Sequence, residues 1–239
     1  MKKLNLSGVV ASTVIGLTAI AVHAQTDPYA SGTNGYDVSY PNSCTATVSG
    51  ASFGIVGVNG GRPFTTNACF STQFGHAPAG AAYINVAYSG AYRKNITSSC
   101  VSLVSTTSLT GSYAQAWEIG CSEADTSLSD AGSAAPVMWW LDVETANSWS
   151  STNFKLNDDA IRGAADRLRG VTGKAVGVYS TPSAWYTITR NANLSPYLDG
   201  EWNAGASACP ASGAIGFAGA PIWLEQTGSS GEIDADSAC

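Results

Sequence analysis

The stretch VMWWLDVETANSW, residues 137–149, carries the clearest indication of the fold. A run of large apolar side chains leads into two carboxylates two positions apart, Asp142 and Glu144. Alternate side chains of a strand point to the same side, so Met138 and Trp140 would share one face with both acids. Such a strand is typical of a (β/α) barrel, in which apolar side chains fill the interior and polar ones gather at the C-terminal rim.

Strand-like and helix-like segments alternate along the chain. Residues 157–169 carry apolar side chains at helical spacing, with acids at the start and arginines near the end, and residues 112–132 form a second predicted helix. We therefore predict an α/β protein, a TIM-like (β/α) barrel whose last strands are short of helices, with one domain over residues 25–239. Eight segments rich in Val, Ile, Tyr or Trp and bounded by Gly, Pro or Asn are the predicted strands: 35–39, 53–61, 81–90, 137–144, 175–181, 201–206, 214–219 and 221–226.

Residues 1–24 are predicted to be a secretory signal peptide. Two lysines precede an apolar run at residues 9–21, and Val22-His23-Ala24 is small at the two positions that a signal peptidase reads. The run is too short to remain in a bilayer as a spanning helix. We expect cleavage after Ala24 and a secreted monomer, extracellular or periplasmic, that is not attached to the membrane.

The chain is acidic, and its basic residues are scattered. The formal net charge is −6, from 11 Lys and Arg against 17 Asp and Glu, and it would become −8 without the two lysines of the signal peptide. Nucleic acids and anionic membranes bind to basic faces, so we expect neither as a partner.

Six cysteines remain after cleavage, an even number that predicts three disulfides in an exported protein. No two of them have the C-x-x-C spacing typical of zinc sites, so we expect no metal. Cysteines close in sequence on neighbouring barrel loops can meet with little rearrangement. The predicted pairs are Cys44–Cys69, Cys100–Cys121 and Cys209–Cys239.

Several classes of chemistry are excluded by residue type. His76 is the only histidine of the predicted mature chain, so a multi-histidine metal site is impossible and a Ser-His-Asp triad would need this residue. Ser52 lies in GASFG, which matches a nucleophile elbow, but a strand follows where that motif requires a helix. No dinucleotide-binding loop is present and no cofactor is expected. Carboxylates and aromatic rings remain.

Paired carboxylates on one strand face can form the core of a glycosidase, because a like charge raises the pKa of the acid that protonates the leaving oxygen. Asp142 would supply that charge to Glu144. The alternative is that both acids cap the strand and bind backbone or arginine. Asp37 lies near the end of the first predicted strand, and Asp234 and Asp236 follow the last. Strands one and eight meet when a barrel closes, so these acids would gather on one rim.

Aromatic residues near strand ends could stack on the faces of sugar rings, although each could equally be part of the core. They are Tyr36, Tyr88, Tyr179, Trp202 and Trp223.

The motifs GYDVS, WWLDVE, VGVYST, EWNAGA, IWLEQ and IDAD occur in an order that resembles glycoside hydrolase family 25, the lysozyme-type muramidases, in its secreted bacterial branch. The resemblance spans nearly all of the predicted mature chain. It implies that Glu144 is the general acid, with Asp142 beside it, Asp37 as the first-strand aspartate and Asp234 as the aspartate of the closing motif. It also implies that Asp142 or Asp37 orients the acetamido group of the sugar, and that Gln226 contacts the substrate.

Two departures from the family pattern are present. Thr227 follows Gln226 where the family usually has an aromatic residue, and Asp236 stands where it usually has asparagine. The expected function is a secreted glycosidase acting on peptidoglycan. The alternatives are a hydrolase of another bacterial surface polysaccharide, an envelope-glycan-binding barrel without activity, and a structural or interaction protein.

Overall fold

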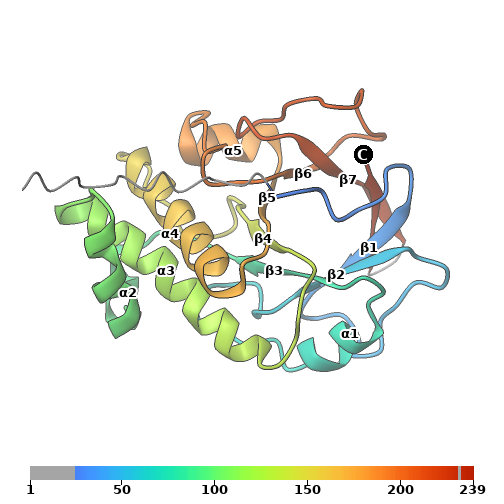
Figure 1. The fold of residues 1–239 in the computed structure, drawn as a ribbon, viewed down its shortest axis with the longest axis horizontal. Helices are drawn as coiled ribbons and strands as arrows, with labels where there is room; N and C mark the ends of the chain where they lie inside the picture. Colours follow the sequence, from blue (N-terminus) through green and yellow to red (C-terminus); the bar gives the residue numbers. More distant parts are fainter. Residues whose placement is uncertain (1–24, 231–232) are drawn as a thin grey trace, which may run out of the picture.

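The computed structural model describes residues 25–230 and 233–239, and the predicted signal peptide lies outside the described residues. Its strands close into a barrel in which β1 to β7 run parallel and β8 runs antiparallel to both β7 and β1 (Figure 1). The predicted (β/α) barrel is confirmed. The strands are β1 (Asn34–Val38), β2 (Phe53–Gly57), β3 (Ala81–Asn85), β4 (Trp139–Asp142), β5 (Val176–Ser180), β6 (Glu201–Ala204), β7 (Ile222–Ser230) and β8 (Ile233–Ala238).

The prediction of a strand at residues 214–219 is wrong. Apart from an isolated bridge between Ile215 and Pro221, this segment is a loop, and the seventh strand is β7, which contains most of the predicted eighth. The reason is the buried carboxylate of Glu201, whose Oε1 accepts hydrogen bonds from the backbone N–H groups of Ala218 and Ala220, each at 2.9 Å. Donors that a strand would give to its neighbour are given to this carboxylate instead.

Helices cover the outside of the barrel along β2 to β6, whereas β7 and β8 have none in the described part of the chain (Figure 1). The two predicted helices are confirmed as α3 and α4, and the expected scarcity of helices near the last strands is also confirmed. None of the described helices is both long and apolar enough to cross a membrane. The helices are α1 (Phe70–His76), η1 (Gly90–Asn95), α2 (Ser98–Leu103), η2 (Val104–Thr106), α3 (Gly111–Ala131), α4 (Phe154–Thr172) and α5 (Pro182–Thr189).

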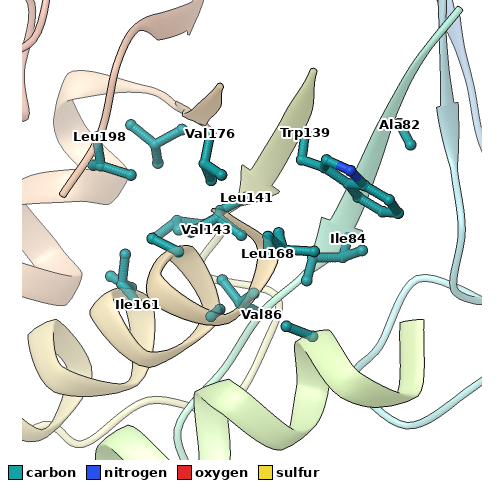
Figure 2. Packing of buried hydrophobic residues seen from close by; sticks show 14 of the residues in the cluster. Ala82, Ile84, Val86, Trp139, Leu141, Val143, Ile161, Leu168, Val176 and Leu198 are labelled. Carbon is teal, nitrogen blue, oxygen red and sulfur yellow. The ribbon is translucent and has the colours of Figure 1, made fainter. Parts of the chain in front are cut away.

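Alternation along the β4 segment divides its side chains between two cores. Trp139 and Leu141 point outward into the layer between the barrel and the helices, in the same cluster of buried residues as Ile161 and Leu168 of α4 (Figure 2). Met138 and Trp140 point inward and are fully buried in the barrel interior, as predicted. The apolar run therefore serves both layers, because a strand buried on both faces needs apolar side chains on each.

Helices α3 and α4 touch backbone to backbone. A Cβ atom on Gly120 would lie 1.8 Å from the carbonyl oxygen of Ala160, and one on Gly163 would lie 2.1 Å from that of Trp117. Neither distance leaves room for a methyl group, so both glycines are required by the close approach of the helices.

We expect Gly163→Ala to lower the free energy of unfolding by at least about 1–3 kcal/mol, because overpacking forces the two helices apart. Gly170→Ala on the same helix is the matched control, since a Cβ there meets nothing within 4 Å. Alanine should stabilise that position by about 0.5–1 kcal/mol through helix propensity. Urea denaturation measures both changes, and equal stability of the two variants would contradict the packing argument.

Three disulfides join the predicted pairs, with Cα–Cα distances of 4.7 Å for Cys44–Cys69, 5.8 Å for Cys100–Cys121 and 5.3 Å for Cys209–Cys239. The third joins the loop after β6 to Cys239, immediately beyond β8. Because Ser237 is paired with Asn34 at the start of β1, this bond lies at the end of the barrel opposite the acids.

Candidate active site

A cavity of about 190 Å³ opens at the C-terminal end of the parallel strands. All four acids predicted to be catalytic line it, together with three of the predicted substrate-binding residues. No arginine or lysine is among its lining residues. The lining consists of Asp37, Ser39, Tyr83, Asp142, Glu144, Tyr179, Trp202, Gln226 and Asp234.

Strand register brings the acids together from distant parts of the sequence. Asp37 on β1 is paired with Asp234 on the antiparallel strand β8. Asp142 at the end of β4 is paired with Asn85 on one side and with Tyr179 on the other. Strands one and eight are neighbours as predicted, although Asp234 lies within the last strand and not after it.

Two hydrogen-bonded groups fix the carboxyls. The hydroxyl of Tyr179 donates to Oε1 of Gln226 at 2.9 Å, and Nε2 of Gln226 donates to Oδ2 of Asp37 at 2.9 Å. Nδ2 of Asn85 donates to Oδ2 of Asp142. The second oxygen of Asp142, Oδ1, is buried and has no hydrogen-bond partner in the protein.

Burial raises the pKa of every acid in the cavity. For Asp37, burial outweighs the hydrogen bond from Gln226 and raises the pKa from 3.8 to about 7. The pKa of Asp142 is raised well above its ordinary value by burial and then by the charges of Glu144 and Asp37. The pKa values of Glu144 and Asp234 are raised mainly by burial. With no cation lining the cavity, protons compensate the charge.

The charge that acts on Glu144 differs from the predicted one. After burial, the cause of its raised pKa is the carboxylate of Asp234 and not that of Asp142. Asp142 is only 6% exposed, so it holds its proton to higher pH and is neutral while Glu144 titrates. A neutral carboxyl exerts no like-charge repulsion on its neighbour.

Asp236 lies below the cavity and does not line it. Its side chain is buried, and Oδ1 accepts a hydrogen bond of 2.9 Å from the indole Nε1 of Trp202. Burial raises the pKa of Asp236 well above the usual range, and the charge of Asp37 raises it further. Asp236 is therefore a neutral carboxyl beneath the ionisable ones.

The predicted sugar-stacking residues fall into two groups. Tyr179 and Trp202 line the cavity. Tyr36 is buried in the core outside the barrel, and Trp223 packs edge-on against Trp140 inside it. Tyr88 is half-buried in the loop after β3, where its backbone N–H donates to the carbonyl of Ser148. None of these last three lines the cavity.

Sequence reasoning missed Ser39 and Tyr83, which line the cavity, and Asn85, which holds Asp142. The alternation that placed Asp142 could have found two of them, because Tyr83 and Asn85 share a face of β3 and are paired with Trp140 and Asp142.

No group of three or more His, Cys, Asp or Glu side chains is placed to hold a metal ion among the described residues.

Solved structures share this architecture. A family GH25 lysozyme from Aspergillus fumigatus is 13% identical, with a TM-score of 0.60 over 87% of this chain and 94% of that one. The barrel has the family 25 lysozyme fold. A bacterial lysozyme from Streptomyces coelicolor is 20% identical, with a TM-score of 0.56 over 87% of this chain and 92% of that one. A family 25 glycosyl hydrolase from Bacillus anthracis is 12% identical, with a TM-score of 0.57 over 92% and 94% of the two chains. No protein-family model and no curated protein matches the sequence.

The buried acids should make the protein more stable in acid than at neutral pH. Because folding raises the pKa of Asp37 from 3.8 to about 7, its contribution to stability is fully present below the lower value and is lost as the pH rises through the higher one. Asp142 and Asp236 act in the same direction. Thermal unfolding should therefore show a falling Tm between about pH 4 and pH 7.5.

Asp236→Asn should raise the Tm at neutral pH and flatten this dependence, because an amide keeps an acceptor for Trp202 without an ionisable proton. Asp130→Asn, outside the cavity, removes the same formal charge and serves as the control. A Tm that rises with pH in the wild-type protein would contradict the conclusion that burial raises the pKa values of these acids.

Proposed function

We propose that the protein is a secreted glycoside hydrolase that cleaves the glycan strands of peptidoglycan, with Glu144 as the acid. The observation that carries the proposal is the cavity at the C-terminal end of the barrel, where Glu144 has a raised pKa beside a neutral Asp142. The fold supports it, because solved structures with the same fold are described as lysozymes and muramidases. The predicted signal peptide would export the protein to its substrate.

Glu144 has the properties of a proton donor. It is half-buried and lines the cavity, and no described residue donates a hydrogen bond to its carboxyl group. Its proton is therefore available to a ligand and is retained to higher pH than in water. Transfer of that proton to the glycosidic oxygen would let the leaving sugar depart as an alcohol.

Asp142 and Asp37 would act on the sugar that remains. Oδ1 of Asp142 has no protein partner, so it is free to bind the acetamido group of an N-acetylated sugar. Attack by the acetamido oxygen on the anomeric carbon would then replace attack by an enzyme carboxylate. Asp37, held by Gln226, would stabilise the positive charge that develops on the ring.

Tyr179 and Trp202 would bind the sugar beside the acids. Their rings lie 4.5 Å apart between centroids and both line the cavity. The hydroxyl of Tyr179 is already engaged by Gln226, so its ring position is fixed before a ligand arrives. Aromatic rings that are already held in position lower the entropic cost of binding a sugar.

We expect Glu144→Gln to fold and bind glycan while its rate falls by about 10²–10⁴-fold, the usual contribution of general acid–base catalysis. Glutamine keeps the shape of the side chain and removes the transferable proton. The assay is the release of reducing ends from purified peptidoglycan, with mass analysis of the products to identify the bond that is cut. Glu118→Gln on α3 is the control and should keep the wild-type rate. A wild-type rate in Glu144→Gln would place the chemistry elsewhere, and glycan retention without products would favour a binding protein.

The alkaline limb of the pH–rate profile should report the ionisation of Glu144. Asp234→Asn removes the charge that raises the pKa of Glu144, so the limb should move to lower pH. Asp142→Asn should cost rate but leave the limb in place, because Asp142 is neutral over that range. Initial rates measured from about pH 4 to pH 8 separate the two variants. The opposite pattern would restore Asp142 as the charged neighbour.

A further inference from the structure

A second cavity of about 430 Å³ adjoins the first. Gln226 and Asp234 line both cavities, so the two meet at these residues. The other lining residues are small and come from the loop after β6 and from the middle of β7. We call the second cavity the β7-edge groove, and it is lined by Gly205, Ala206, Ser207, Gln226, Thr227, Gly228 and Asp234.

The groove has no aromatic ring among its lining residues, in contrast to the acid-lined cavity with Tyr83, Tyr179 and Trp202. It therefore lacks the flat apolar surface on which a sugar ring stacks. It presents polypeptide backbone and small polar groups, which suit a ligand that is bound through its own backbone.

One edge of β7 is open where it borders the groove. Strand β6 ends at Ala204, and its pairing with β7 ends at Gln226. Strand β7 continues beyond this point. On its other side it is paired with β8, where Gly228 lies opposite Ala235. Beyond Gln226, no described strand pairs with β7 on the side of the groove, and Gly228 is exposed there.

The opposite wall is held in place. The chain leaves β6 at Gly205, which has a φ of +99°. The loop that follows is anchored through Cys209 to Cys239. No strand is described between Ala204 and Ile222, so this loop does not supply a partner strand for β7.

We propose that the β7-edge groove binds a peptide substituent of the glycan, which adds as an extended strand to β7 while its sugar occupies the acid-lined cavity. This inference rests on the proposed function. An open strand edge binds extended peptides through backbone hydrogen bonds. Asp234 lies at the junction of the two cavities and would disfavour an anionic substituent, so a neutral peptide or one with a free amino group fits best.

The test compares two soluble fragments, a disaccharide with its peptide and the same disaccharide after an amidase has removed the peptide and the exposed carboxylate has been converted to a neutral methylamide. Their affinities for the Glu144→Gln protein are measured by calorimetry. We expect the peptide-bearing fragment to bind at least about tenfold more tightly, the gain from two or so backbone hydrogen bonds. Equal affinities, or no binding of either fragment, would overturn the proposal.

Gly228→Trp, added to the Glu144→Gln protein, should make the affinities for the two fragments equal. A Cβ at Gly228 meets nothing within 4 Å and its φ is not positive, so the indole can enter the groove without strain. Gly75→Trp on α1 is the control, because its Cβ also meets nothing within 4 Å. It should keep the tenfold contrast. If Gly228→Trp weakened both fragments equally, the groove would bind sugar and the proposal would be wrong.

Cleavage of peptidoglycan by the wild-type protein is measured separately. If no bond is cut while the contrast between fragments persists, the hydrolase proposal fails and the peptide site stands. If bonds are cut and the contrast is absent, the peptide site fails and the hydrolase stands.

Discussion

The indole of Trp140 fills the centre of the barrel and determines what its neighbours can be. Its ring lies edge-on to Trp202 and Trp223, with centroid distances of 5.8 Å and 6.4 Å. The adjacent strand can pass only because it carries Gly177, where a Cβ would lie 2.2 Å from the indole. The large ring and the missing side chain together fill one layer of the interior, so a few aromatic residues on β4, β6 and β7 set the width of the barrel.

This aromatic layer is also the floor of the cavity. Trp202 packs against Trp140 on one side and lines the cavity on the other, and its indole binds Asp236. Carboxyls above such a floor lose water on one side and meet no cation, so they favour their neutral forms. Packing and chemistry are therefore coupled, because the side chains that stabilise the barrel also bury Glu144 and so raise its pKa.

The sequence was sufficient where one strand carries all the information. Alternation within residues 137–144 placed the interior and the acid-lined rim without reference to any other segment. It failed where a partner distant in sequence decides the structure. Residues 214–219 have the composition of a strand, but Glu201 binds their backbone. Strand β8 escaped prediction because Asp234 and Asp236 occupy its inner face, whereas patterning assumes that the polar side of a strand meets solvent. The neutral state of Asp142 likewise depends on burial, which spacing does not reveal.

The antiparallel closure of β8 against β1 has a consequence for how the protein folds. Asp37 and Gln226 are 189 positions apart, and their hydrogen bond forms only when the two ends of the barrel meet. Contacts of such long range form slowly, because the chain between them must first be ordered. Before that step the acids of β1 and β8 are separate, hydrated and ionised in neutral solution. When the last strand docks, these acids come together and take up protons from the medium. Closure of the barrel is therefore favoured in acid and is opposed by repulsion between the carboxylates at neutral pH.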